Sequence, residues 1–337
     1  MSSTIKARPR SFSRISGLGI FRPERVVTND EICQKIESSD EWIRERSGII
    51  ERRFADADTT IIDMSVAAAE LAIADAGLTA QDIDAIYVAT LSHPYQTPSA
   101  AVLIADRLGL DNPGAVDISA ACSGFSYAVG IADGLVSIGQ HKNVLVIGVE
   151  KLSDWVDPYD RGTAFLFADG AGAVVVSQSD VAAIGPTING SNGGEWEAIV
   201  CFPDWLSLRD DARKNTVGAW PVLHMQGQKV FRWAVTEMVP VCKAALEAAG
   251  VTMDDLDLFI PHQANMRITD ALVRGLALPD SVAIARDIAT AGNTSAASIP
   301  LAMDRMRSEG VAKSGDLALL VGFGAGLAYS AQVVRIP

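Results

Sequence analysis

"LAIADAGLTAQDIDAIYVAT" (residues 71–90) and "AALEAAGVTMDDLDLFIPHQ" (residues 244–263) share one pattern. Each begins as an Ala-rich helix, passes through an Ala-Gly pair, a Thr and an acidic turn, and ends as an apolar strand. Gly77 of the first stretch lies 173 residues before Gly250 of the second, about half of the 337-residue chain. The sequence therefore predicts an internal duplication.

Two later segments recur in the same order. "ACSGFSYAV" (121–129) is matched by "GNTSAASIPLAM" (292–303), which aligns Cys122 with Asn293. "FADGAGAVVV" is likewise matched by "VGFGAGLAYS", and we read each as a Gly turn that leads into a strand. Three matches in one order are hard to obtain by chance.

Nearly continuous apolar strands alternate with helices in both halves, which is typical of sheets covered on both faces. We therefore predict an α/β fold of two similar halves, residues 1–180 with Cys122 and residues 181–337 with His262 and Asn293. Sites are expected at the strand-to-helix turns, near the pseudo-twofold axis.

Composition narrows the class of protein. Hydrophobic residues make up 49% of the chain and charged residues 20%, enough for a large core. A net charge of −13 without a long basic run argues against a nucleic-acid partner. The start, "MSSTIKARPRSFSRI", lacks a signal-peptide core, and no apolar run is long enough to span a membrane. We expect a cytoplasmic protein without a membrane partner.

The four cysteines, Cys33, Cys122, Cys201 and Cys242, lie far apart and include no CxxC pair. This spacing predicts free thiols, with neither a disulfide framework nor a metal cluster.

Cys122 lies between the strand-like "AVDIS" and the helix-like "SGFSYAVGIADGLVSIG". A thiol at a helix N-terminus is exposed to the positive end of the helix dipole, which favours the thiolate. The alternative is an inert core cysteine. The turn, together with the matched segment of the second half, favours a nucleophile.

His262 and Asn293 lie at comparable turns of the second half. His262 follows a buried strand in "IPHQANMRI", although a lone histidine is more often structural. Asn293 opens a helix, where it is either an N-cap or a donor to a developing negative charge. "GFGAG" (322–326) precedes a strand rather than a helix, so it fits a turn beside the site better than a dinucleotide loop.

"SSDEWIRERSGI" (38–49) has the spacing of a capping box from Ser38 to Glu41, and Gly48 can end this short helix. Trp42 and Arg46 would share one face, able to stack on a base and hold a phosphate, or to form a surface cation–π pair. Arg267 and Arg274, seven residues apart, form a basic stripe or a solvated face.

Several motifs in this order resemble β-ketoacyl-acyl-carrier-protein synthase III, of the thiolase-fold superfamily. The resemblance extends from about residue 14 to residue 337 and rests on "SAACSGFSYA", "DRGTAFLFADGAGA", "PHQAN", "GNTSAASIP" and "GFGAG". It implies a five-layered αβαβα fold and a homodimer. It also implies decarboxylative condensation of an acyl-CoA primer with malonyl-acyl-carrier protein, the first step of type II fatty acid synthesis, without a metal or redox cofactor.

The resemblance also implies roles for residues. Cys122 would carry the acyl group, and its backbone N–H with that of Ala325 would form the oxyanion hole. His262 and Asn293 would bind the malonyl thioester and stabilise the enolate. Trp42 and Arg161 would sandwich the adenine of CoA, and the rest of the CoA groove would comprise Ser38, Arg46, Gly227, Gln228 and Arg267. Gln228 stands where the family often has Asn.

Two further surfaces follow from the same resemblance. Arg232, Arg267 and Arg274 would meet the acidic carrier protein, because local rather than net charge guides an encounter. Phe231 and Phe323 would line the tunnel. Thr97 stands where some members have an aromatic residue that closes the acyl pocket across the dimer, so primers larger than acetyl are expected to fit.

Related activities differ at identifiable positions. Thiolases have a second catalytic cysteine near the C-terminal Gly turn, but no cysteine follows Cys242; elongating synthases have a second histidine where this chain has Asn293. Chalcone-synthase-like enzymes share Cys, His and Asn, so a starter-unit synthase of a secondary pathway is the nearest enzymatic alternative. A non-catalytic carrier-binding subunit is the alternative from another class, and it would be expected to lose part of this set.

Overall fold

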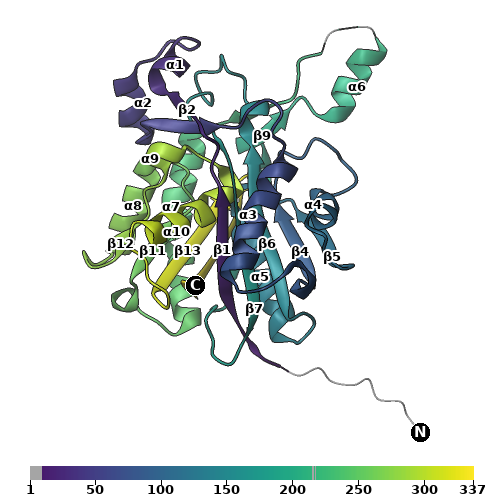
Figure 1. The fold of residues 1–337 in the computed structure, drawn as a ribbon. Coiled ribbons are helices and arrows are strands. Elements are labelled where there is room, and N and C mark those ends of the chain that lie inside the picture. The colour runs from purple at the N-terminus through teal and green to yellow at the C-terminus, as the bar shows by residue number, and fades with distance from the viewer. Residues whose placement is uncertain (1–9, 215, 217) are drawn as a thin grey trace.

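The computed structural model describes residues 10–214, 216 and 218–337 (Figure 1). Residues 1–9, which belong to the N-terminal stretch without a signal-peptide core, lie outside the described residues. Two five-stranded sheets form the body of the protein. The first has the order β1 (Phe12–Phe21), β7 (Asp169–Ser179), β6 (Asn143–Lys151), β4 (Ala85–Ala89), β5 (Gly114–Ile118). The second has the order β12 (Ala283–Ile284), β11 (Leu258–Pro261), β13 (Leu317–Gly324), β14 (Ala328–Arg335), β8 (Ile188–Ser191).

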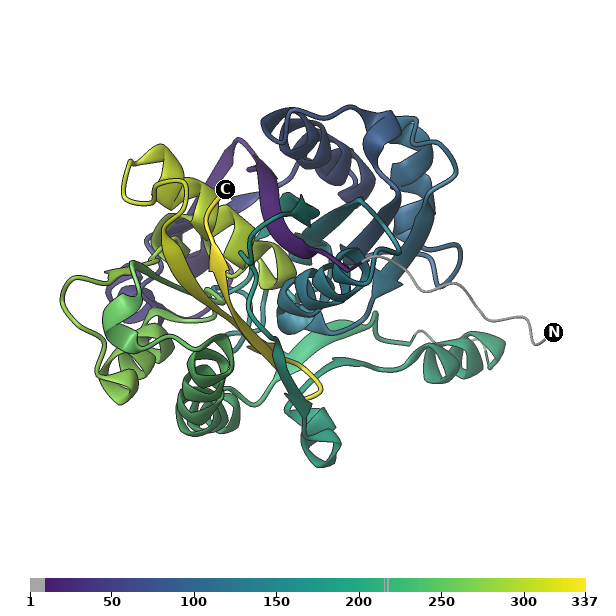
Figure 2. The same cartoon turned by 90° about the horizontal axis from the view of Figure 1, so that it is seen from below.

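Helices cover both sheets and fill the space between them. The outer face of the first sheet packs against α3 (Ile61–Asp75) and α4 (Ala100–Leu108). Between the sheets lie α5 (Gly124–Ser137) and α10 (Ser298–Ser308), which both contact strands of both sheets. The second sheet is covered by α7 (Gly227–Ala249), against which α8 (Met266–Leu276) packs. Figures 1 and 2 show these five layers, so the expected αβαβα fold is confirmed.

The central layer can be this tightly enclosed because its residues are small or apolar. One core cluster joins Phe125 and Val129 of α5 with Ile299 and Met303 of α10, all buried, and with strands of both sheets. Gly148 allows β6 to lie against the turn before α10, since a Cβ at this position would lie 2.3 Å from the carbonyl oxygen of Ala296. The two halves therefore share one core.

The backbone repeats with the spacing that Gly77 and Gly250 predicted. Both glycines have φ of +69°; Gly250 is the C-cap of α7, and Gly77 directly follows Ala76, the C-cap of α3. The next turns repeat as well, since Thr79 and Thr252 each form a capping box with an aspartate three residues later. The strands that follow are β4 and β11. Both are interior strands, and their carboxyl ends lie on the side of the sheets where the polar turns are found.

The expected alignment of Cys122 with Asn293 is wrong. Each central helix is preceded by a 3₁₀ turn whose first residue has a left-handed conformation, Ala121 (φ +44°) before α5 and Ser295 (φ +47°) before α10. These turns lie 174 residues apart, so the equivalent of Cys122 is Ala296. Matching small residues by sequence placed the second segment three residues too early.

The two glycine-rich segments also differ. "GFGAG" includes a turn, since β13 and β14 form an antiparallel hairpin that pairs Gly324 with Ala328. In "FADGAG", by contrast, Gly170 and Gly172 lie within β7 rather than in a turn. A Cβ at Gly172 would lie 2.6 Å from Pro300, so these glycines permit α10 to pack on the strand.

The remaining helices and strands lie at the end of the molecule where the carboxyl ends of β5 and β11 are found (Figure 1). They are β2 (Arg25–Thr28), α1 (Asn29–Cys33), α2 (Asp40–Ser47), β3 (Glu51–Phe54), β9 (Ile199–Phe202), α6 (Trp205–Arg213), β10 (Val222–Met225) and α9 (Ile288–Ala291). In the described part of the chain, no helix combines the length and apolar character needed to cross a membrane. Nor do the described His, Cys, Asp and Glu side chains form a group of three that could hold a metal ion.

Candidate active site

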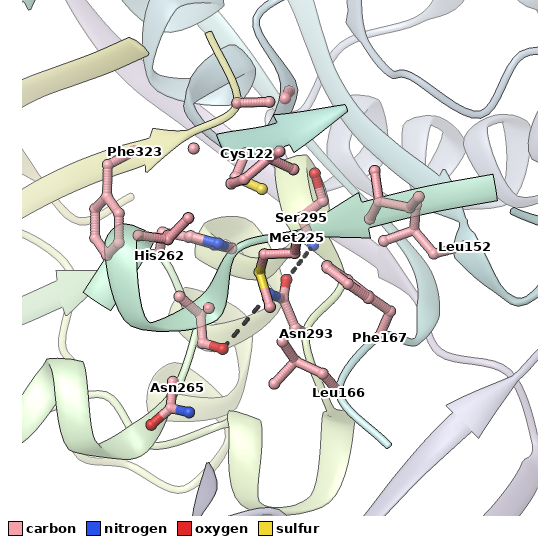
Figure 3. A pocket seen from close by; sticks show the side chains of 18 of the residues that line it. Cys122, Leu152, Leu166, Phe167, Met225, His262, Asn265, Asn293, Ser295 and Phe323 are labelled. Atoms are coloured by element: carbon pink, nitrogen blue, oxygen red, sulfur yellow. Dashed lines mark hydrogen bonds between the residues drawn. The ribbon is translucent and has the colours of Figure 1, made fainter. Parts of the chain in front are cut away.

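Cys122, His262 and Asn293 line one largely apolar cavity at this end of the molecule (Figure 3). They come from the turn before α5, from the end of β11 and from the segment before α10. Exposure is 9% or less for all three side chains. The structure thus brings together residues from both halves of the chain.

The hairpin of β13 and β14 lies directly against the thiol. A Cβ at Gly324 would lie 3.0 Å from Cys122 Sγ and 3.2 Å from its backbone nitrogen, so only glycine fits there. Ala325, the next residue, also lines the cavity. The backbone of this hairpin is therefore close to Cys122, where the predicted oxyanion hole requires it.

Burial disfavours the ionised form of the Cys122 thiol. Burial raises its pKa to about 12, although a hydrogen bond with the Ser295 side chain lowers it. Burial thus acts against the expected preference for thiolate, because desolvation disfavours the charged form whereas the N-terminus of the following helix favours it. Acylation of this thiol requires a proton acceptor.

His262 is held as a neutral hydrogen-bond donor. Its Nδ1 lies 2.7 Å from Ser298 Oγ, which also accepts the Gln263 N–H at 3.3 Å. The Ser298 hydroxyl can then donate its own proton to Nδ1, which leaves the imidazole proton on Nε2. Burial lowers the His262 pKa to about 3, so the ring stays neutral at physiological pH. Phe323 packs against the ring with centroids 5.3 Å apart.

Asn293 lies before the 3₁₀ turn that leads into α10 but is not an N-cap, because Thr294 and Ala297 occupy the two N-cap positions. Its Oδ1 accepts the Ser295 N–H at 2.9 Å. Among the described residues, its Nδ2 has one partner, the carbonyl of Ala264 at 3.5 Å (Figure 3). The amide carries two N–H groups, so one is left for a ligand. The bond from the Ser295 N–H therefore orients the Asn293 amide.

Three of the expected nucleotide-binding residues, Trp42, Arg46 and Arg161, lie together but are not among the residues that line the cavity. Arg161 lies 4.7 Å from the ring of Trp42, and Arg46 lies 5.8 Å from the same ring. A base between Trp42 and Arg161 would require the guanidinium to move away, since it now rests on the ring. The N-cap of α2 is Ser39 rather than Ser38, whose Oγ has no partner among the described residues. Gly48 ends α2 in a left-handed conformation, as predicted.

The start of α7 contributes to the cavity wall. Gly227 and Phe231 line the cavity, whereas Gln228 is exposed outside it. Arg267 of α8 lies 5.5 Å from the Phe231 ring, which holds the guanidinium beside the cavity wall. Arg232 and Arg274 are exposed on the same pair of helices.

Several of the expected ligand-binding arginines have no carboxylate partner. In the described parts of the chain, no ion pair involves Arg46, Arg161, Arg232, Arg267 or Arg274. Most other arginines do pair, such as Arg286 with Asp270 on α8. An acidic protein therefore leaves without a carboxylate partner the arginines that we expect to bind anionic ligands.

The inner cavity of the single chain is apolar. Its walls include Leu91, Leu152, Leu166, Phe167, Ile199, Leu223 and Met225, together with the expected Phe323. Thr97 does not line it and is exposed in the single chain. A role for Thr97 at an acyl pocket therefore depends on a second subunit.

Sequence reasoning missed three polar residues beside the catalytic candidates. Ser298 is hydrogen-bonded to His262, and Ser295, which lines the cavity with Cys122, donates to the fully buried Glu150. Glu150 carried one sequence signal, an acidic residue at the end of an otherwise apolar strand. The serines carried none, because serine is common at helix starts.

Comparison with known families and proteins agrees with this geometry. Residues 116–193 match the family 3-oxoacyl-[acyl-carrier-protein (ACP)] synthase III, and residues 246–336 match its C-terminal counterpart. The β-ketoacyl-[acyl-carrier-protein] synthase III of Streptomyces glaucescens is 53% identical over the full length of both chains. The chain belongs to the β-ketoacyl-acyl-carrier-protein synthase III family.

Other members of the synthase III family are similarly close. The mycobacterial β-ketoacyl-[acyl-carrier-protein] synthase III of Mycobacterium marinum is 52% identical over 95% of this chain and 94% of its own. Among solved structures, the priming β-ketosynthase of the R1128 polyketide pathway has a TM-score of 0.96 and 44% identity, with 99% of each chain covered. The synthase III of Aquifex aeolicus VF5 has a TM-score of 0.87 and 41% identity, covering 96% of this chain and 99% of its own.

Proposed function

We propose that this chain condenses an acyl-CoA primer with malonyl-acyl-carrier protein, releasing CoA and CO2 and starting type II fatty acid synthesis. One observation carries the proposal: a thiol and two neutral donors share an apolar cavity. The division of labour follows the two halves. Residues 1–180 supply the nucleophile and residues 181–337 supply the donors.

In the first half-reaction, Cys122 attacks the primer thioester. Its sulfur forms a bond to the acyl carbon, and the negative charge moves to the carbonyl oxygen. The backbone N–H groups of Cys122 and Ala325 hold this oxyanion until CoA leaves. The close contact of Gly324 with Cys122 supports this role for the hairpin.

In the second half-reaction, His262 and Asn293 hold the malonyl thioester carbonyl. Loss of CO2 leaves an enolate, which attacks the acyl group on Cys122. Two neutral donors suit this step, because they stabilise the enolate oxygen without supplying a proton that would quench it. The neutrality of His262 follows from its burial.

The remaining residues bind the carriers of the two acyl groups. CoA lies along Ser38, Trp42, Arg46, Arg161, Gly227, Gln228 and Arg267, and Arg161 moves off Trp42 to admit the adenine. Arg232, Arg267 and Arg274 dock the acidic carrier protein. The chemistry needs no metal or redox cofactor. The enzyme acts in the cytoplasm, without a nucleic-acid or membrane partner.

The enzyme functions as a homodimer in this proposal. The edge strand β5 is unpaired on one side in the described structure, and Val116 on it is 48% exposed. An unpaired edge with an exposed apolar residue favours pairing with a second copy. Thr97 would then reach the acyl pocket of the partner subunit.

Charge reversal at the docking surface tests the carrier-protein part of the proposal. The double variant Arg232→Glu/Arg274→Glu is expected to raise KM for malonyl-acyl-carrier protein about tenfold, because like charges now meet at the rim. Turnover of malonyl-CoA should stay unchanged. Arg14→Glu is the matched control, since Arg14 is exposed on β1 away from the cavity. Equal effects on both malonyl donors would contradict docking at these arginines.

A panel of primers tests Thr97. The wild-type enzyme is expected to acylate Cys122 from branched or longer acyl-CoAs as well as from acetyl-CoA. Thr97→Phe should lower acylation by the larger primers about tenfold while sparing acetyl, because the aromatic ring fills pocket space. Gln96→Phe controls for a new aromatic residue on the same exposed loop. Exclusive use of acetyl-CoA by the wild type would refute this role.

A starter-unit synthase of a secondary pathway is the second candidate. The similarity to the R1128 priming ketosynthase favours it specifically. Efficient condensation with malonyl-CoA, or with a pathway-specific carrier protein only, would support this candidate. A non-catalytic carrier-binding subunit would form no acyl-enzyme with any primer.

A further inference from the structure

Glu150 is a fully buried carboxyl group that the mechanism above does not use. It lies near the end of β6 with 0% of its surface exposed. Within the described residues it has no Lys or Arg partner, and the adjacent Lys151 directs its ammonium to the carbonyls of Asp56 and Ala57. A buried acid without a cation is costly, so it is retained only with compensating contacts.

Hydrogen-bond donors replace the missing cation. Oε2 accepts from Ser92 Oγ at 2.7 Å, from the Leu91 N–H at 3.2 Å and from Thr90 Oγ1 at 3.4 Å. Oε1 accepts from Ser295 Oγ at 3.1 Å. One oxygen therefore anchors the carboxyl to the loop after β4, and the other faces the catalytic cavity.

Ser295 connects this carboxyl to the nucleophile. Ser295 and Cys122 line the same cavity, and Figure 3 shows the Ser295 hydroxyl beside the Cys122 sulfur. The left-handed backbone of Ser295 and its N–H bond to Asn293 Oδ1 fix the hydroxyl in place. A hydroxyl that donates to Glu150 can accept from the thiol, so the three groups form a continuous proton path.

We propose that Glu150, acting through the Ser295 hydroxyl, takes up the Cys122 proton when the thiol is acylated. The thiol proton passes to Ser295 Oγ as the Ser295 proton passes to Glu150 Oε1. The sulfur electron pair forms the bond to the acyl carbon, and collapse of the oxyanion breaks the bond between that carbon and the CoA sulfur. The proton returns along the same path to CoA, which restores the carboxylate. This inference rests on Cys122 being the acylated thiol.

The surroundings of Glu150 suit a proton acceptor. Burial raises its pKa to about 7, whereas the bonds from Ser92, Leu91 and Ser295 lower it. The titratable groups that face it are Cys122 and Cys201, and its negative charge raises the pKa of both thiols. Transfer of the thiol proton to Glu150 removes that charge as the sulfur becomes anionic. His262 is neutral throughout this range.

The pH profile of Cys122 acylation tests the proton path. The acylation rate is measured with the full-length enzyme by rapid quench and intact mass. The wild-type rate should level off above pH about 7, where Glu150 is ionised. Glu150→Gln and Ser295→Ala should be about 10²-fold slower at pH 7 and should keep rising to pH 9, because only preformed thiolate reacts. Ser92→Ala removes a bond that lowers the Glu150 pKa, so its midpoint should move to higher pH.

Asp169→Asn is the matched control, because Asp169 is a buried carboxyl of β7 bonded to Ser153 and Ala55 instead. It should keep the wild-type pH profile. A Glu150→Gln variant that keeps the wild-type profile, at full or reduced rate, would overturn the proposal and leave Glu150 a structural residue.

Alkylation of Cys122 by iodoacetamide separates this inference from the proposed function, because it needs no acyl-CoA. Altered alkylation profiles in Glu150→Gln and Ser295→Ala would support the path even if wild-type Cys122 formed no acyl adduct. Absence of that adduct would instead overturn the assigned function. Unaltered alkylation profiles, with a normal wild-type adduct, would overturn the path alone.

Discussion

Cys122→Ala is expected to abolish the acyl adduct and to lower turnover by at least about 10⁴-fold, because the covalent step loses its nucleophile. Intact mass after incubation with a panel of acyl-CoAs measures the adduct and identifies the primer. The small loss of side-chain volume should leave the fold intact, since Ala120 and Ala121 already surround the turn with small residues. The thermal melting curve checks this.

Cys242→Ala and Cys201→Ala are the matched controls. Cys242 is buried in α7 and Cys201 lies on β9, and neither lines the cavity. Both variants should keep the adduct, although Cys242→Ala is expected to be less stable because it creates a small void. An adduct that survives in Cys122→Ala would show that another residue receives the acyl group.

Asn293→Asp is expected to leave acylation of Cys122 largely intact and to slow malonyl decarboxylation by about 10³-fold. The carboxylate can still accept the Ser295 N–H, so the local fold is retained. It replaces the free N–H with a negative charge that opposes the enolate. His262→Gln should act in the same direction, with a loss of about 10² from one weakened donor.

Carbon dioxide release from malonyl-acyl-carrier protein measures the second step, and intact mass measures the first in the same samples. Asn189→Asp is the control substitution, because Asn189 is exposed on β8 at the sheet edge. Equal loss of acylation and decarboxylation in Asn293→Asp would indicate a collapsed site rather than a lost donor. Normal decarboxylation would remove Asn293 from the mechanism.

Local patterns predicted the architecture well. The helix, glycine and capping-box sequence around Gly77 and Gly250 specifies a helix end and a strand start through contacts within a few residues. Strand-to-helix turns were predicted at Cys122 and His262 for the same reason. Apolar strands that alternate with helices predict sheets with both faces buried, and helices on both sides of each sheet provide that burial.

Errors arose where short segments fit more than one arrangement. Ser38 and Ser39 are both good capping residues, and only the helix geometry selects Ser39. Glycines in "FADGAG" fit either a turn or a close approach of a helix, and the packing of α10 on β7 selects the second.

By itself, the sequence determined the duplicated α/β fold and the catalytic candidates, since periodicity, turns and motif order are properties of neighbouring residues. Tertiary structure decided the pKa shifts of Cys122 and His262, because both depend on how completely packing excludes water. It also decided the link between Ser295 and Glu150, which lie 145 residues apart and meet only where the two halves share a core.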